Sequence, residues 1–234
     1  MRIHSVNVGL PQEISDGKRT IVSGIYKMPV GGRVMARRLN LEGDGQADLE
    51  SHGGEQRAIY AYPWVHFQHW ARQMGRDGFP PGAFGENLTL DAVTEQDVCI
   101  GDRYRVVPSG GTPEGSAAGE AVLEVTQPRP PCYKLEMRLA APGFAKTFLR
   151  SGRVGFYLRV IEEGEIGAGD EMERIAEGPE QMSVRQISEL MYFHKDNLAD
   201  AERALRIPAL SPGWRDSFRQ RVGAAEGEGK ETTP

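Results

Sequence analysis

Glycine and proline break the first 176 residues into short segments, and this punctuation limits the folds that the chain can adopt. The 234 residues include 29 Gly and 15 Pro, a composition that favours tight turns and short strands over long helices. Eight or nine segments between the turns are β-branched or alternate apolar and polar side chains. The sequence therefore predicts a barrel or sandwich. Its expected strands lie near 2–8, 20–27, 33–39, 58–61, 87–90, 97–107, 121–126, 155–161 and 170–174.

Helical patterns interrupt this β region. Pro63 suits the first position of a helix whose aromatic and apolar residues recur at helical spacing up to Gly75. Two further helices are expected, over about 131–139 and 144–149. The stretch 108–120 has low complexity and is predicted to be a loop.

After residue 176 the pattern changes to three short amphipathic helices. Ser183 and Gln186 have the spacing of a capping box, and Asp196 can cap the second helix. Ser211 followed by Pro212 is a start signal for the third. A unit of about 40 residues is near the lower limit of independent stability, so we expect it to pack against the barrel or a partner. The predicted division is a barrel domain over 1–176, a three-helix domain over 177–222 and a disordered polar tail over 223–234.

Charge and composition exclude several classes of protein. With 28 Lys and Arg against 33 Asp and Glu, the net charge is −5, which is unlike the basic balance of proteins that bind nucleic-acid polymers. No segment approaches the roughly 20 apolar residues of a membrane helix, and the start lacks the apolar stretch of a secretory signal. Two cysteines are too few for a disulfide scaffold. We therefore expect a cytoplasmic protein with free thiols and a small-molecule ligand.

Cys132 lies in the segment with the strongest chemical signal, QPRPPCYK at 127–134. The prolines before it indicate a helix N-terminus, and Arg129 and Lys134 add positive charge, so both features favour a thiolate. A thiolate can act as a nucleophile or as a soft-metal ligand. The residues alone leave this open against a buried cysteine that only packs. Cys99, within a strand-like run, is predicted to be such a packed thiol.

His52 stands before two glycines in a second notable segment. Gly53 and Gly54 allow the backbone to approach a ligand closely, and Arg57 can bind a phosphate through two hydrogen bonds. An ordinary glycine-rich turn explains the same residues. The glycine spacing fits neither a dinucleotide fingerprint nor a phosphate-binding P-loop.

Other polar residues sit in turns where a ligand role and a structural role are both open. Glu86 and Asn87 follow a glycine at the start of a strand, Arg153 lies between glycines, and Lys27 precedes a turn. His66 and His69 are three residues apart on a predicted helix, but no third metal ligand is near them in sequence. The structural interpretation of these two histidines is favoured.

Six motifs, in this order and spacing, resemble the MOSC domain family, which is related to the C-terminal domain of molybdenum-cofactor sulfurase. With the C-terminal helices, the chain is similar to the YiiM type of this family from about residue 1 to 220. The motifs are SGIYKMPVGG at 23–32, LEGDGQADLESHGG at 41–54, FGENLTL at 84–90, VCIGDRYRV at 98–106, QPRPPCYKL at 127–135 and SGRVGFYLRV at 151–160.

This resemblance implies a closed β-barrel with a pocket for the pterin-type molybdenum cofactor. It makes Cys132 the metal ligand and the catalytic thiol, in agreement with the argument from its neighbours. The residues implied to bind the cofactor are Lys27, His52, Gly53, Gly54, Arg57, Glu86, Asn87, Arg129, Lys134 and Arg153. The cations among them are candidates for its phosphate.

The YiiM type is associated with removal of the hydroxyl oxygen from N-hydroxylated bases such as 6-hydroxylaminopurine. Molybdenum suits this reduction because it changes oxidation state while accepting oxygen. A separate reductase is then implied as electron donor, since no flavin, haem or iron–sulfur motif is visible. Position 57 is Arg where the family usually carries Lys, and a Pro replaces the usual Gln two residues before Cys132. These departures leave the substrate less determined than the cofactor.

Three other functions remain open from the sequence. The chain can be a non-catalytic carrier of the cofactor, or of a sulfur atom on Cys132. It can be a binding module for another phosphorylated ligand such as pyridoxal phosphate, with a structural cysteine. A cysteine-dependent hydrolase is weaker, because no His partner can be assigned. A homodimer is compatible with all of them.

Overall fold

The computed structural model describes residues 1–17, 19–47, 53–111 and 119–231 of the chain. His52 and residues 112–118 of the expected loop at 108–120 lie outside the described residues. Within the described ranges, no helix combines the length and apolar character that a membrane span requires.

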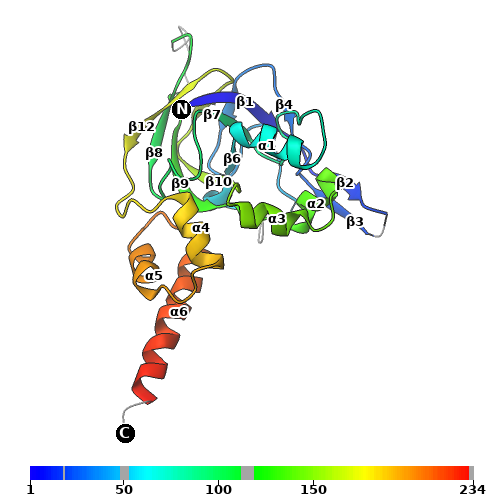
Figure 1. Ribbon diagram of the computed structural model, residues 1–234. Helices are drawn as coiled ribbons and strands as arrows, with labels where there is room; N and C mark the ends of the chain where they lie inside the picture. The colour runs from blue at the N-terminus through cyan, green and yellow to red at the C-terminus, as the bar shows by residue number, and fades with distance from the viewer. Residues whose placement is uncertain (18, 48–52, 112–118, 232–234) are drawn as a thin grey trace.

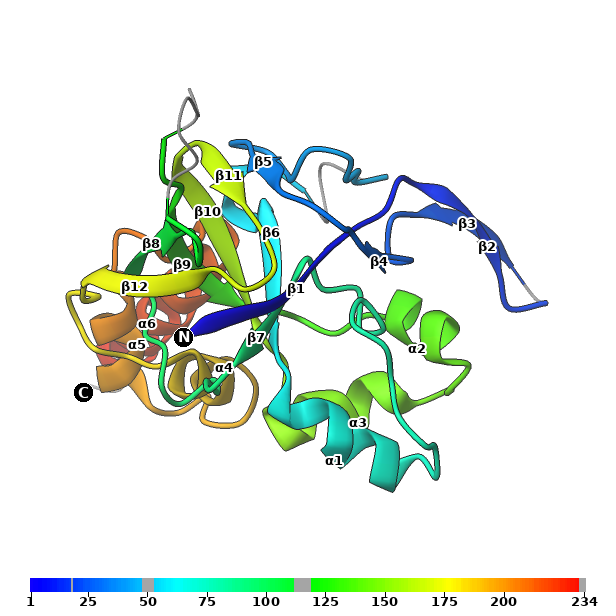
Figure 2. The same cartoon turned by 90° about the horizontal axis from the view of Figure 1, so that it is seen from above.

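A closed barrel of seven strands forms the body of the chain (Figures 1 and 2). The ring closes because β12 pairs with β1 through Arg2 and Glu171. Neighbours are antiparallel except β6 and β7, which run parallel. This confirms the predicted barrel. In order around the ring, its strands are β1 (Arg2–Val8), β7 (Leu88–Asp91), β6 (Ile59–Pro63), β10 (Phe156–Glu162), β9 (Val122–Pro128), β8 (Arg103–Val107) and β12 (Glu171–Ala176).

Five further strands are short and lie outside the ring. β2 (Gln12–Ser15) and β3 (Thr20–Ser23) form a hairpin that projects away from the barrel in Figure 2. β4 (Met28–Pro29) pairs with β1, and β5 (Val34–Ala36) pairs with β11 (Gly164–Ile166). The sequence analysis missed β2, β4 and β11, since two to four residues are too few to show a period.

Three α-helices pack beside the barrel over an aromatic cluster. They are α1 (Val65–Gln73), α2 (Tyr133–Leu139) and α3 (Phe144–Ser151), and the 3-10 turn η1 (Glu55–Arg57) precedes β6. Trp70, Phe84 and Phe148 are fully buried in this cluster, and the Trp70 indole donates a hydrogen bond of 2.6 Å to the hydroxyl of Tyr62. Pro63 ends β6 and Trp64 caps α1, so the helix starts later than predicted.

The C-terminal helices share one continuous core with the barrel. They are α4 (Val184–Tyr192), α5 (Leu198–Leu205) and α6 (Pro212–Glu231). Ile187, Leu190, Trp214 and Phe218 are buried in the cluster that also contains the barrel interior. The three helices therefore pack against the barrel, as their small size led us to expect.

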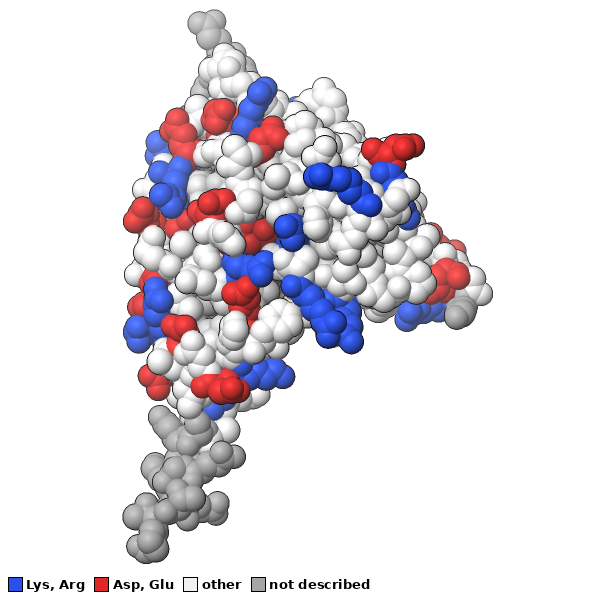
Figure 3. All heavy atoms as spheres, in the orientation of Figure 1, with Lys and Arg blue, Asp and Glu red and all other residues white. Residues whose placement is uncertain are grey.

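Two local predictions for this region were wrong. Asn197, and not Asp196, caps α5, because its side chain accepts a hydrogen bond from the backbone N–H of Asp200. The expected disordered tail is helical from 223 to 231, where it continues α6. That prediction rested on the lack of apolar residues in the tail. On the face seen in Figure 3, acidic and basic side chains are interspersed.

The capping box of α4 is present as predicted and gives a test of this region. The Ser183 hydroxyl accepts from Gln186 N–H at 3.1 Å, and the Gln186 side chain accepts from Ser183 N–H at 2.9 Å. We expect Ser183→Ala to lower the free energy of unfolding by about 1 kcal/mol, because one N–H of the first turn loses its acceptor. Urea unfolding measures this. Ser217→Ala, at a half-buried position of α6, is the control, and equal effects in both variants would contradict the cap.

Candidate functional site

A cavity that is open to solvent lies between the foot of the β2–β3 hairpin, the start of α2, the barrel strands β6 and β10, and the residue that follows β9. Figure 2 shows the hairpin and α2 on the same side of the barrel. The cavity brings together six residues singled out from the sequence: Lys27, Arg57, Asn87, Arg129, Cys132 and Lys134.

Cys132 lies half-buried in the cavity wall and is the N-cap of α2. The prolines before it thus mark a helix start, as predicted. Because α2 has only seven residues, the positive charge near the Cys132 thiol comes mainly from cationic side chains and less from the end of the helix. Arg129 and Lys134 line the same cavity, and the electrostatic interaction with Cys132 contributes to the raised pKa of Arg129.

Arg129 is a buried cation with unused hydrogen-bonding capacity. Arg129 is the residue after β9 and is 5 % exposed. Its Cζ atom lies 5.3 Å from the centre of the Tyr60 ring and 5.7 Å from the centre of the Phe148 ring. Burial acts to lower the pKa of Arg129, but facing groups, chiefly Tyr60 and Tyr157, outweigh it and the pKa is raised. Among the described residues, none accepts a hydrogen bond from its buried Nη1. A buried donor of this kind favours an anionic acceptor in the cavity.

Lys27 is buried in the cavity wall, where it belongs to a short polar network. Its Nζ lies 2.5 Å from Oδ1 of Asp44, which also accepts from Gly9 N–H at 2.9 Å. Burial lowers the pKa of Lys27, against the attraction of Asp44. Asp44 is the one carboxylate among the described lining residues, facing four cations, so the described wall is net positive. Sequence analysis missed Asp44, since a Gly-Asp-Gly turn gives no sign of a buried ion pair.

Asn87 and Glu86 make hydrogen bonds to other protein groups around the cavity. Asn87 lines the cavity, but its Nδ2 donates to Oδ2 of Asp44 at 2.9 Å and its Oδ1 accepts from Tyr60 N–H at 3.0 Å. Glu86 does not line the cavity. It is fully buried and accepts from Gly82 N–H at 2.5 Å, Phe84 N–H at 3.0 Å and the Thr89 hydroxyl at 2.9 Å. Its expected contact with a ligand is therefore corrected to a role inside the turn.

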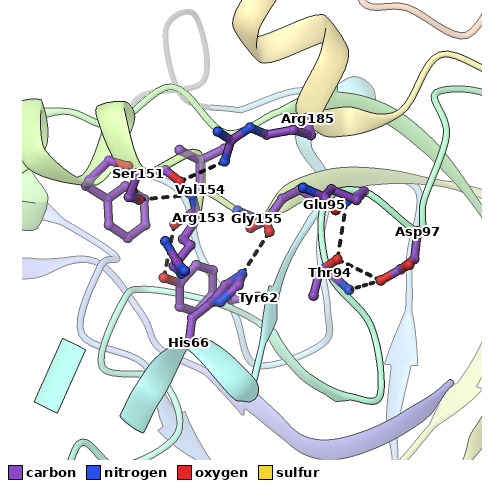
Figure 4. Close-up of polar contacts among 12 residues, drawn as sticks. Tyr62, His66, Thr94, Glu95, Asp97, Ser151, Arg153, Val154, Gly155 and Arg185 are labelled. Atoms are coloured by element: carbon purple, nitrogen blue, oxygen red, sulfur yellow. Dashed lines mark hydrogen bonds and ion pairs between the residues drawn. The ribbon is translucent and has the colours of Figure 1, made fainter. Parts of the chain in front are cut away.

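Three other predicted residues lie away from the described cavity. Gly53 and Gly54 precede η1, where the Gly54 carbonyl accepts from Arg57 N–H at 2.9 Å and so helps to place that residue. Arg153 borders a separate hollow that also contains His66 and Glu95 (Figure 4). A residue in a turn can direct its side chain toward either side, so the sequence did not show that Arg153 borders this second hollow and not the cavity of Cys132. The expectation that Arg153 binds the same ligand as Arg129 is corrected.

His66 and Cys99 lie outside the cavity that contains Cys132. His66 Nε2 lies 2.8 Å from Oε2 of Glu95, and both side chains are buried. No group of three or more His, Cys, Asp or Glu side chains that could hold a metal occurs in the described part of the chain. Cys99 is half-buried outside the cavity, and burial raises the pKa of its thiol.

Two sequence profiles match this chain. That of the MOSC domain covers residues 48–173, which is more than half of the 234 residues. The chain belongs to the MOSC domain family. A second profile, described as the YiiM-like 3-alpha helix domain, covers residues 182–223. The MOSC barrel is thus followed by the helical domain that the resemblance implied.

Relatives of this MOSC protein cover almost its whole length. The uncharacterized protein YflK of Bacillus subtilis (strain 168) is 40% identical over 93% of this chain and 92% of its own. The crystal structure of YiiM from Geobacillus stearothermophilus matches with a TM-score of 0.77 and 35% identity, over 94% of this chain and 98% of that one. A protein named Reductase from Gibberella moniliformis is 32% identical over 88% of this chain, but over only 35% of its own length.

The buried Glu86 of the MOSC barrel makes the stability of the fold depend on pH. Burial raises its pKa to about 7, against the hydrogen bonds from Gly82, Phe84, Thr89 and its own backbone N–H, which lower it. The folded protein therefore retains a proton that the unfolded chain releases near pH 4.5. As pH rises from 4.5 to 7, wild type should lose about 3 kcal/mol of stability relative to Glu86→Gln.

Urea unfolding at several pH values measures this difference. Glu13→Gln, at an exposed position of β2, is the control. A difference between wild type and Glu86→Gln that stays constant from pH 4.5 to 7 would show that Glu86 does not titrate in this range.

Proposed function

We propose that this chain is a molybdenum-cofactor-dependent oxidoreductase that reduces N-hydroxylated compounds, such as base analogues of the 6-hydroxylaminopurine type. One observation carries the proposal. The buried Arg129, whose Nη1 has no acceptor among the described residues, lies in the same cavity as Cys132. Such a cavity joins a site for an anionic group to a soft metal ligand.

The residues present fit the pterin-type cofactor. Its phosphate requires cationic donors, and Arg129, Arg57 and Lys134 line the cavity. Cys132 supplies a sulfur ligand of the kind that suits a metal already bound by dithiolene sulfur. When bound, the cofactor supplies a metal that changes oxidation state and accepts oxygen.

The protein must then orient the substrate and hold protons for the reaction. Reduction of R–NHOH with two electrons and two protons gives R–NH2 and water, so the N–O bond breaks and its oxygen leaves as water. Lys27 Nζ holds protons at the cavity wall beside Asp44, and its lowered pKa makes it a stronger acid than an exposed lysine. Tyr60 and Tyr157 line the cavity with aromatic surface suited to a planar base.

In this proposal the electrons come from a separate reductase. The protein and its electron donor are both proposed to be cytoplasmic. The relative from Gibberella moniliformis supports this, because it is named Reductase and about two thirds of its length lies outside the match. That additional length is available for a redox module.

A second candidate function is a carrier that binds the cofactor and passes it on. The half-buried position of Cys132 in a cavity open to solvent favours it. A carrier shares the binding residues of the oxidoreductase, but it does not turn over substrate.

Metal content tests the binding part of the proposal. We expect about one molybdenum per wild-type chain purified from a host that makes the cofactor, and at least a tenfold loss in Cys132→Ser, since the metal loses its protein ligand. Cys99→Ser, at the half-buried thiol outside the cavity, is the matched control and should retain the metal. Arg129→Met should also lose it. Wild type without molybdenum and without pterin refutes the proposal and favours another phosphorylated ligand, such as pyridoxal phosphate.

Turnover separates the two candidates. Loaded wild type, supplied with a flavoprotein reductase, should convert 6-hydroxylaminopurine to adenine, as followed by chromatography. Loaded protein that reduces no hydroxylamine but transfers its cofactor to another enzyme is the carrier.

A further inference from the structure

The turn between α3 and β10 forms the support of Arg129. We call residues 151–155 the supporting turn. Its Gly155 carbonyl accepts from Arg129 N–H at 3.2 Å, and its Val154 carbonyl accepts from the Tyr60 hydroxyl at 2.9 Å. The Tyr60 ring is the surface over which the Arg129 guanidinium lies. The supporting turn therefore fixes both the backbone of Arg129 and the ring beside its charge.

Glu95 holds the supporting turn from within the protein. Its carboxylate is 3 % exposed and lies outside the cavity. Oε1 accepts from Gly155 N–H at 2.7 Å, and Oε2 pairs with His66 (Figure 4). Gly155 has a φ of 70°, and a Cβ there would lie 2.5 Å from the Ala61 carbonyl oxygen. The turn is thus tightly packed at the point that touches Arg129.

Arg185, from helix α4, holds the other end of the turn. Its Nη1 donates to the Ser151 carbonyl at 2.7 Å, as Figure 4 shows, and its backbone N–H donates to the Glu95 carbonyl at 2.9 Å. A Cβ on Gly152 would lie 1.8 Å from the same Nη1, so the guanidinium packs directly on the turn. One residue of the helical domain therefore contacts both the turn and the segment that carries Glu95.

We infer that Glu95 and Arg185 are positioning residues for Arg129, and that through Arg185 the helical domain sets the affinity of the cavity for anions. Neither residue lines the cavity, so each acts through the supporting turn. The inference rests on the proposed function in one respect, the assignment of Arg129 as the residue that binds an anionic group. It gives the helical domain a role in the site even though its helices lie outside the cavity.

The test compares an anionic and a neutral reagent at Cys132. The full chain, in a Cys99→Ser background and from a host unable to make the cofactor, is alkylated with iodoacetate or iodoacetamide. The ratio of the iodoacetate rate to the iodoacetamide rate measures how strongly the cavity attracts the carboxylate of iodoacetate. A general change in the exposure or reactivity of the thiol alters both rates together and leaves this ratio unchanged. Arg129→Met should lower this ratio at least tenfold.

We expect Glu95→Gln and Arg185→Ala to lower the ratio threefold to tenfold, and Arg185→Lys to restore part of it, because lysine keeps one donor for the Ser151 carbonyl. Two variants are matched controls that should leave the ratio unchanged. Glu124→Gln alters another buried barrel carboxylate, which pairs with Arg103, and Arg206→Ala alters a helical-domain arginine that pairs with Glu180. Thermal unfolding checks that each variant is folded. The Arg185 side chain is 29 % exposed, so substitutions of it disturb folding less than those of the buried Glu95. If Glu95→Gln does not fold, the Arg185 variants alone decide the test.

The outcomes separate the inference from the proposed function. A ratio that falls in Arg129→Met, but stays at the wild-type value in Glu95→Gln and Arg185→Ala, overturns the inference and leaves the proposed function intact. A ratio that Arg129→Met does not change refutes the anion-binding role of Arg129, and both fail together. A fall of equal size in the two control variants also overturns the inference, because it shows that any buried ion pair or helical-domain arginine has the same effect.

Discussion

A guanidinium held out of water in the wall of a cavity is the feature on which the rest of this structure depends. Removing an arginine from water is costly unless its surroundings replace the lost hydration. Here two aromatic faces lie over the charge, and a backbone carbonyl of the neighbouring turn fixes its main chain. The protein side chains still leave Nη1 without an acceptor in the described structure. In the proposed function, an anion in the cavity completes the surroundings of Arg129.

The barrel supplies this arrangement because it brings distant segments into adjacent strands. Tyr60 on β6 faces Tyr157 on β10 in register, and β10 in turn pairs with β9, which leads to Arg129 and then Cys132. The ion pair of Lys27 and Asp44 lines the same cavity and is tied to the barrel through Asn87. The site is thus a consequence of strand order. Its cations come from the loop before β4 (Lys27), from η1 (Arg57), from the residue after β9 (Arg129) and from helix α2 (Lys134).

Periodicity, caps and prolines are local signals, and they were sufficient for a barrel or sandwich, for the three C-terminal helices and for the place of Cys132 at a helix start. The choice of a closed barrel came from the family resemblance. It was insufficient wherever a side chain in a turn chooses its direction through distant contacts. Arg129 and Arg153 both stand beside prolines or glycines, yet only the first lines the cavity. Glu86 has the appearance of a surface acid, and its burial follows from the packing of a whole turn around it. Asp44 gave no signal, since its partner Lys27 lies 17 residues away.

Closure of the barrel between its first and last strands sets an order of events during synthesis. β1 leaves the ribosome first, but its partner β7 begins at Leu88 and the closing strand β12 begins at Glu171. Contacts between residues so far apart in sequence form slowly, because a long loop must close first. The N-terminal strand therefore remains without its final neighbour until about three quarters of the chain has been made. The helical domain emerges only after that closure becomes possible, and it adds to a barrel that is already able to form.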